Sequence, residues 1–303
     1  MFSVVGTDIG NISTISTSDD NQIVIESRIK EFTNLNELGS NEVFEYEGKK
    51  YVVEQGKFEN NYIKHDKENF LQLLFYSIAK VAKEDRVKLV LGIPAGQYNQ
   101  NRDKLKKFIM ENNFKRITIG LGKDSITRNI FIDEVMICPE SYGVKAIGAM
   151  KQCKANIKSL VIDIGGGTTD IAEFDEQGKF IDGESIETGL LDLYRNTRKV
   201  LNDEFGAKAT LEEARKYFDG ELELMNGDNE YKKPLLLDNM KSILNELRGL
   251  YPNMSQLNLI LTGGGAKKGY SLFSKLYPQT IVVSDITANS RGFYNVGVKK
   301  WVK

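Results

Sequence analysis

The sequence opens with short apolar runs separated by glycine-containing or polar turns, and a similar arrangement begins again near its middle. Runs of this length that are bounded by turn residues predict β-strands. We expect three consecutive strands at the start of each half, at Ser3–Thr7, Ile12–Thr17 and Gln22–Ile29, and at 159–163, 169–175 and 179–187. This meander is the one internal duplication that the sequence predicts.

Between and after the meanders, apolar residues recur at the spacing of amphipathic helices. In Lys67–Lys83, for example, Phe70, Leu74 and Ile78 fall on one helical face. The same reasoning predicts helices at 99–112, about 140–152, 189–204, 210–218, 235–250, 266–276 and 287–301, and single strands at 87–93, 116–121, 126–137, 257–262 and 280–283. Apart from a hairpin at 43–54, the segment 31–66 is predicted to be irregular, and 219–233 is predicted to be a surface loop. Strands that alternate with helices in this way indicate an α/β protein.

Length and composition narrow the class of protein. With 303 residues the chain is long enough for two domains, which we place at 1–155 and 156–303. A net charge of −1 lacks the basic excess that proteins binding nucleic acid directly usually have. Cys138 and Cys153 lie among apolar neighbours and predict core residues, not a disulfide or a metal site. No signal peptide and no apolar run of about 20 residues is recognisable, so we expect a cytoplasmic protein without membrane contact.

Each meander contains the tripeptide Asp-Ile-Gly, at Asp8–Gly10 and at Asp163–Gly165. In both places a buried strand ends in the acid, and a glycine-containing turn leads into the next strand. Because glycine has no Cβ, such a turn lets backbone N–H groups approach a ligand closely, and these groups attract anions, phosphates above all. The pattern is not the P-loop, since no lysine follows and no helix begins there. Two such hairpins predict a site that grips one phosphate chain from both sides.

These hairpins resemble the phosphate-1 and phosphate-2 motifs of the superfamily of actin, heat-shock chaperones and sugar kinases. The other motifs of that superfamily follow in order, since Met136–Ala149 resembles its first connecting segment, Leu259–Ala266 its adenosine motif and Ala288–Gly297 its second connecting helix. Segments 44–54 and 91–94 are most similar to bacterial and archaeal actin-like proteins of the ParM type. The resemblance covers nearly the whole chain.

The resemblance implies an α/β fold of duplicated actin-like (RNase H-like) domains, each a mixed five-stranded sheet flanked by helices, with a nucleotide cleft between them. It also implies that the segment of about 31–66 is a small outer subdomain of the first domain. The final helix, at about 287–303, is expected to return from the second domain and pack on the first.

In this cleft, ATP, or GTP, is expected to bind through groups of both hairpins and of the adenosine motif. The implied binding residues are Asp8, Gly10, Asn11, Ser13, Gly165, Gly166, Gly167, Thr168, Thr169, Gly189, Gly263, Gly264 and Gly265. A polyphosphate needs a balancing cation, and Mg²⁺ typically uses one or two carboxylates together with phosphate oxygens. Asp8 and Asp163, at the ends of equivalent strands, are therefore the candidate Mg²⁺ ligands.

Two further acids are candidates for catalysis. Glu140 stands where polymerising members of the superfamily carry a residue that positions the attacking water, so the resemblance implies that role here. Asp170 matches an acid of the phosphate-2 motif and is expected to act with Asp163 on the metal or the water.

One position departs from the ParM-type pattern. Such proteins often carry a lysine in the returning strand of the first hairpin, where this chain has Ile15. A cationic phosphate contact is therefore either missing or supplied from elsewhere, with Arg128 and Lys145 as candidates. His65, the only histidine, lies in a polar stretch and is expected to be a solvated loop residue.

The resemblance favours a filament-forming ATPase of the ParM kind, which segregates plasmid DNA through an adaptor protein bound to that DNA, with no direct nucleic-acid contact. One alternative is a small-molecule kinase, which would need a base aimed at an acceptor hydroxyl and usually a longer chain. Another is a non-polymerising ATPase similar to the chaperone nucleotide-binding domain. A cell-shape actin homologue with a membrane-binding tail is a further alternative.

Overall fold

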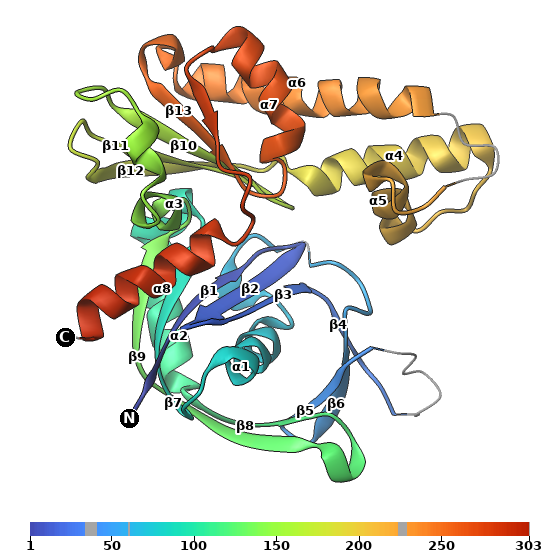
Figure 1. Cartoon of the computed structure of the whole chain (residues 1–303). Coiled ribbons are helices and arrows are strands. Elements are labelled where there is room, and N and C mark those ends of the chain that lie inside the picture. Colours follow the sequence, from blue (N-terminus) through green and yellow to red (C-terminus); the bar gives the residue numbers. More distant parts are fainter. Residues whose placement is uncertain (34–40, 60, 224–228, 303) are drawn as a thin grey trace.

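A computed structural model describes residues 1–33, 41–59, 61–223 and 229–302 of the chain. Parts of the expected outer subdomain (31–66) and of the expected surface loop (219–233), together with Lys303, lie outside these residues. Two β-sheets, each with helices packed against it, form the two halves of the molecule, and the chain crosses between them twice (Figure 1). The fold class predicted from the sequence is confirmed.

The sheet of the first half differs from the expectation in its number of strands, because it has nine and not five, in the order β3-β2-β1-β7-β9-β8-β5-β6-β4. Its strands are β1 (Ser3–Ile9), β2 (Ser13–Ser18), β3 (Asn21–Glu26), β4 (Ile29–Glu31), β5 (Val43–Tyr46), β6 (Lys49–Val53), β7 (Arg86–Ile93), β8 (Phe114–Ile119) and β9 (Ile126–Pro139).

The extra strands follow from the length of β9, which has 14 residues. Its later part pairs in parallel with β7, whereas its beginning pairs antiparallel with β8. Strand β8 in turn pairs with β5, so the predicted hairpin at 43–54 continues the sheet. The five expected strands β3-β2-β1-β7-β9 thus form one end of the sheet, and the added strands curve away from it (Figure 1).

Both faces of this sheet are covered, which explains why β7 is apolar along most of its length. Successive strand residues point to opposite faces. Leu89 and Leu91 pack in the core that α1 (Phe70–Val81) and α2 (Tyr98–Glu111) complete. Val90, between them, packs with Phe293 of α8 (Ala288–Trp301) on the other face.

The second half has the expected five strands, in the order β12-β11-β10-β13-β14. They are β10 (Ser159–Ile164), β11 (Thr169–Phe174), β12 (Phe180–Ile186), β13 (Asn258–Thr262) and β14 (Thr280–Val282), and the helices are α4 (Leu190–Phe205), α5 (Leu211–Asp219), α6 (Lys232–Leu250) and α7 (Ala266–Leu276). Leu160 and Ile162 of β10 pack under α4, α6 and α7, whereas Val161 packs on the opposite face with Val144 and Ala288.

The chain first crosses between the halves just after β9, and here the predicted helix at about 140–152 is wrong. A short helix α3 (Tyr142–Ala146) is followed by the 3₁₀ helix η5 (Ala149–Gln152). Gly148, between them, has φ of 84°, a left-handed conformation that ends a helix and that glycine adopts readily. The second crossing leads into α8, which lies across β1, and a Cβ on Gly6 would fall 2.2 Å from the carbonyl oxygen of Ser290.

The two crossing helices touch at a pair of glycines, Gly143 of α3 and Gly292 of α8. A Cβ on Gly292 would fall 2.0 Å from the carbonyl oxygen of Gly143 and 2.4 Å from its Cα. Both neighbours are backbone atoms, so neither can rotate away. Only glycine therefore fits at these two positions, where the chain passes between its two halves.

We expect Gly292→Ala to lower the free energy of unfolding by about 1–3 kcal/mol, the usual cost of overpacking, because α3 and α8 must separate. The measurement is urea denaturation. The matched control is Gly249→Ala in α6, where an added Cβ meets no atom within 4 Å. This control should gain up to about 1 kcal/mol from helix propensity alone. Equal gains in both variants would contradict the close contact.

Candidate functional site

The two Asp-Ile-Gly hairpins have the same backbone geometry. In the first, Asp8 pairs with Ile15 and the amide of Gly10 donates to the carbonyl of Ser13 at 2.8 Å. In the second, Asp163 pairs with Asp170 and the amide of Gly165 donates to the carbonyl of Thr168 at 2.9 Å. The duplicated meander expected from the sequence is therefore present, and equivalent backbone hydrogen bonds close the two turns.

The tips of the hairpins meet and enclose a cavity between the two halves. Its main chamber has a volume of about 240 Å³, and a smaller chamber of about 70 Å³ adjoins it. Six residues line both chambers, namely Asp8, Gly10, Asn11, Asp163, Gly165 and Gly166. Ser13, Gly263 and Gly264 line the main chamber, and Gly167, Thr168, Glu140 and Asp170 line the smaller one.

Three of these glycines are required by close contacts. A Cβ on Gly166 would fall 2.6 Å from Cγ1 of Ile12, and one on Gly167 would fall 2.6 Å from Nδ2 of Asn11. Gly263 has φ of 82°, and a Cβ there would fall 2.1 Å from Oδ1 of Asp163. The hairpin tips and the adenosine-motif turn therefore approach one another at distances that only glycine allows.

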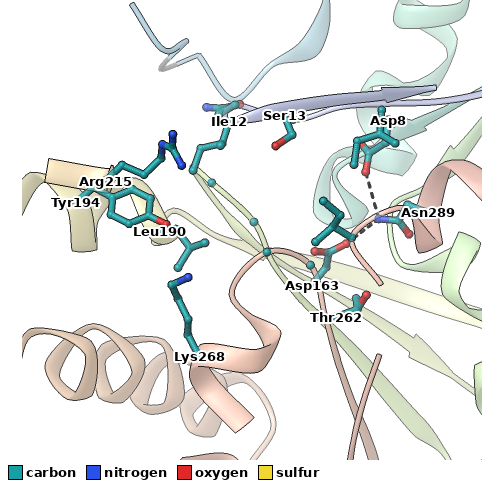
Figure 2. A pocket seen from close by; sticks show the side chains of 18 of the residues that line it. Asp8, Ile12, Ser13, Asp163, Leu190, Tyr194, Arg215, Thr262, Lys268 and Asn289 are labelled. Carbon is teal, nitrogen blue, oxygen red and sulfur yellow. Dashed lines mark hydrogen bonds between the residues drawn. The ribbon is translucent and has the colours of Figure 1, made fainter. Parts of the chain in front are cut away.

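Asn289, at the start of α8, holds the two candidate metal ligands together (Figure 2). Its Nδ2 donates to Oδ2 of Asp163 at 2.7 Å and to Oδ2 of Asp8 at 3.3 Å. Asp8 comes from the first sheet and Asp163 from the second, so this amide connects both halves at the floor of the cavity.

Two buried lysines complete the smaller chamber. Lys64, in the 3₁₀ helix η2 (Lys64–Asp66), lies 2.5 Å from Oε1 of Glu140 and 3.3 Å from Oδ1 of Asp8. Lys67 donates to Oδ1 of Asn11 at 2.6 Å. Both lysines line the chamber, and only 2% of the Lys64 side chain is exposed. These residues supply the cations that the sequence argument sought in Arg128 and Lys145.

Arg128 and Lys145 themselves lie elsewhere. Arg128 pairs with Asp85 and donates to carbonyls at the end of α1, and Lys145 lies over the rings of Tyr142 and Phe174. Neither lines a chamber of the cavity.

Three acids of the cavity, Asp163, Glu140 and Asp170, have raised pKa values. Burial, reinforced by Asp8 and Asp170, raises the pKa of Asp163 to about 7. Burial also raises the pKa of Glu140 well above its usual value, although Lys64 opposes the shift. Burial alone would lower the pKa of Lys64, but Glu140 and Asp8 together outweigh it and raise that pKa. The four carboxyl groups of Asp8, Glu140, Asp163 and Asp170 thus face only two ammonium groups in the smaller chamber, an excess of acids that favours an additional cation.

Burial, followed by the charge of Lys64, lowers the pKa of Lys67 to about 8. Asp170 has both carboxylate oxygens occupied, because Thr168 donates to Oδ2 at 2.8 Å and Ser185 donates to Oδ1 at 2.5 Å. Burial raises the pKa of Asp170 as well, against the effect of these two donors.

Three residues of the expected binding set lie outside both chambers. The hydroxyl of Thr169 donates to the carbonyl of Thr188. A Cβ on Gly189 would fall 2.5 Å from the carbonyl oxygen of Gly166, and one on Gly265 would fall 2.3 Å from Cγ2 of Ile164. These glycines allow α4 and α7 to pack against the second hairpin, so their effect on a ligand would be indirect.

The opposite end of the main chamber is lined by side chains of α4, α5 and α7 (Figure 2). Tyr194 donates to Asp219, which also pairs with Lys268 at 2.9 Å. Arg215 of α5 lies beside them and pairs with Glu26 of the first half at 3.0 Å. In the sequence, the charged residues around Arg215 look the same as the exposed charged face of a helix.

A second ion pair crosses between the halves near Arg215. Arg28 follows β3, and its guanidinium lies 2.6 Å from Glu212 of α5 and 2.5 Å from Glu26. We call Glu26, Arg28, Glu212 and Arg215 the cross-cleft cluster.

The cavity fits an anionic ligand with many oxygens. Nδ2 of Asn11 and Nε of Arg215 are buried donors that have no hydrogen-bond partner among the described residues. Within the same residues no group of three or more His, Cys, Asp or Glu side chains could hold a metal ion. The amide of Asn289 holds the carboxylates of Asp8 and Asp163 close together, and two carboxylates are a donor set that Mg²⁺ uses with phosphate oxygens and water.

The known proteins that are similar to this chain are all actin-like proteins or actin homologues in the matches described below. Residues 6–143 match the family described as actin like proteins N terminal domain. An archaeal actin homologue matches with a TM-score of 0.83 at 19% sequence identity, over 98% of this chain and 100% of that one. Its complex with ADP matches with a TM-score of 0.81 at 19% identity, over 99% and 100% of the two chains.

A third structure, a 15-stranded ParM filament from Clostridium botulinum, matches with a TM-score of 0.80 at 16% identity, over 98% of this chain and 99% of that one. No curated protein gives a significant match to the sequence. The resemblance to actin-like proteins, inferred from the motifs, agrees with the family match over residues 6–143, and the shared fold supports it. Among the described helices, none combines the length and apolar character needed to cross a bilayer.

Proposed function

Because the chain has the two-domain actin-like fold and residues 6–143 match the actin-like N-terminal family, we propose that it binds and hydrolyses ATP, or GTP, with Mg²⁺ and polymerises into filaments. The observation that carries this proposal is the pair of equivalent hairpins that meet around one cavity, each presenting an acid, Asp8 or Asp163, from a different half. We take 1–155 and 156–303 as the two domains, with α8 returning to the first.

The phosphates would lie between the hairpin tips, where Gly10, Asn11, Ser13, Gly165, Gly166, Gly167 and Thr168 offer amides and hydroxyls, and Gly263 and Gly264 would lie against the nucleoside. Asp8 and Asp163 would hold Mg²⁺, which screens the phosphate charge when it is bound. Lys64 and Lys67 would supply the positive charge that Ile15 does not. The set of α4, α5 and α7 side chains at the far end of the chamber would surround the base.

Hydrolysis of the terminal phosphate needs an oriented water more than covalent chemistry. Glu140 lines the smaller chamber, beside the second hairpin, and its carboxylate is held by Lys64. From this side of the chamber, Glu140 would accept a hydrogen bond from the attacking water. Asp170 faces the same chamber, and its two hydroxyl donors would keep it oriented toward the water or the metal.

We further propose that filaments of this protein move plasmid DNA in the cytoplasm through an adaptor protein bound to the DNA. The ParM filament and the actin homologue with ADP support assembly and nucleotide binding by analogy of fold. The net charge of −1 agrees with indirect coupling to DNA. Head-to-tail contacts between copies give an open filament when their rotation does not close into a ring.

The test is sedimentation and light scattering after addition of ATP or GTP with Mg²⁺, with phosphate release followed in parallel. We expect nucleotide-triggered pelleting and phosphate release, and we expect EDTA to abolish both. Phosphate release without pelleting would indicate a non-polymerising ATPase, and turnover only with an added acceptor would indicate a kinase. Failure to bind either nucleotide at millimolar concentration would overturn the proposal.

A further inference from the structure

Asn289 contacts three segments of the chain at once through a single side-chain amide. It is the second residue of α8 and is only 5% exposed. Besides donating to Asp8 and Asp163, it accepts a hydrogen bond at Oδ1 from the backbone amide of Ser141 at 3.1 Å. The sequence marked α8 as a connecting helix but gave no signal for this residue.

Ser141 occupies an unusual backbone position directly after Glu140. Its φ of 73° is left-handed, which is uncommon for a residue other than glycine, and its hydroxyl is buried without a hydrogen-bond partner among the described residues. The Glu140 amide donates to the carbonyl of Ile93 at 2.7 Å. The turn that carries Glu140 is thus fixed on one side by β7 and on the other by the Asn289 amide.

The contacts of Asn289 therefore form a continuous connection from the two candidate metal ligands to the turn that carries Glu140. Gly143 reinforces it, since a Cβ there would fall 2.5 Å from the carbonyl oxygen of Asn289. An amide group is planar, so Nδ2 and Oδ1 cannot move independently. Any change at the carboxylates that displaces Nδ2 also displaces the oxygen that Ser141 uses.

We propose that Asn289 is a positioning residue that couples cation binding at Asp8 and Asp163 to the placement of Glu140. This inference rests on the proposed function. A cation held by the two carboxylates would take lone pairs that Nδ2 now uses and would repel its hydrogens. The amide then shifts, its bond to Ser141 changes, and the turn at Glu140 takes the position that hydrolysis requires. Without the cation, Glu140 stays paired with Lys64.

The experiment is amide hydrogen exchange of the full-length protein with a non-hydrolysable ATP analogue, with and without Mg²⁺, read at peptides that cover 138–144. In the wild type we expect Mg²⁺ to change the hydrogen-exchange rate of the Ser141 amide by about threefold or more, because the hydrogen bond from this amide to Asn289 is altered. In Asn289→Ala, exchange there should be fast and independent of Mg²⁺. Asn289→Ser, whose hydroxyl is too short to span both partners, serves if the alanine variant folds poorly.

The matched control is Ser290→Ala, the next residue of α8, whose hydroxyl bonds to Thr17 and to the carbonyl of Thr287 and to neither acid. This variant should keep the Mg²⁺-dependent change. Phosphate release in Asn289→Ala should fall about tenfold or more, the usual effect of misplacing a catalytic group, with nucleotide affinity nearly unchanged. In a Glu140→Ala background the same substitution should cause no further fall, because Asn289 acts through Glu140.

The outcomes separate this inference from the proposed function. If the analogue binds and Mg²⁺ leaves exchange at 138–144 unchanged in the wild type, the role of Asn289 is refuted while nucleotide binding stands. An additive fall in the Glu140→Ala background would also refute it. If the analogue does not bind at all, the proposed function fails and the inference fails with it.

Discussion

Replacing Glu140 with alanine is expected to slow phosphate release at saturating nucleotide by about a hundredfold or more, the usual loss when a water-orienting or proton-accepting group is removed. Glu140 lines the smaller chamber beside the glycine turn of the second hairpin, and the variant loses its Cγ and its carboxylate. Nucleotide affinity and assembly should be nearly unchanged, because the hairpins and Asp8 keep their positions. Single-turnover phosphate release, with calorimetry for affinity, measures the two effects separately.

Glu134→Ala is the matched control. Glu134 lies on β9, the strand that ends just before Glu140, but its carboxylate pairs with Lys88 and Lys300 outside the cavity. This control should release phosphate at the wild-type rate. Unchanged release in Glu140→Ala would show that another group orients the water, and Asp170 would be the next candidate.

Lys64→Met is expected to have the second large effect, on stability and on nucleotide affinity together. The buried ammonium lies between Glu140 and Asp8, so its loss leaves the buried Glu140 and the partly buried Asp8 without this counter-charge. Breaking a buried pair in this way typically costs about 3–5 kcal/mol of unfolding free energy. Methionine fills the same volume, so the loss reflects charge more than packing. Binding of the triphosphate should weaken as well.

The stability lost in Lys64→Met is expected to depend on pH. Burial already raises the pKa of Glu140 in the folded protein, and removal of Lys64 raises it further. The folded state of the variant then binds more protons than the unfolded chain, so its stability falls as pH rises from the unfolded pKa toward the folded one. The deficit relative to wild type should be smaller at pH 5 than at pH 8 in chemical denaturation.

Lys80→Met controls for the loss of a lysine, because Lys80 of α1 pairs with Glu42 at the surface and its side chain is 32% exposed. Its cost should not exceed about 1 kcal/mol, with little dependence on pH in this range. If Lys64→Met loses as little unfolding free energy as this control, the buried charges must be neutralised in another way.

Local patterns were sufficient to predict most elements of the fold. Helix α7 has the predicted bounds 266–276, and the strands of both meanders lie within a few residues of their expected positions. Turn chemistry and apolar periodicity act over a few residues, so the sequence displays them directly. The nine-stranded sheet was missed because the pairing of β8 with β5 joins segments that are distant in sequence.

The residues of the cavity show more clearly that contacts between distant segments cannot be predicted from local sequence patterns. Asp8 and Asp163 were identifiable because they precede glycine turns that repeat. Lys64, in contrast, sits in a polar stretch without periodicity, and it is buried only because Asp8 and Glu140 arrive from other elements. Gly189 and Gly265 show the same limit, since a glycine needed for helix packing looks the same in sequence as one that approaches a ligand.

The cross-cleft cluster, finally, bears on how long a nucleotide stays bound. With Arg28 joined to Glu212 and Arg215 joined to Glu26, the lobes are fastened at the mouth of the cleft as well as at the crossing helices. If the cavity binds nucleotide as proposed, these ion pairs would have to part before the spent nucleotide leaves, so charge at a point remote from the phosphates would govern its release.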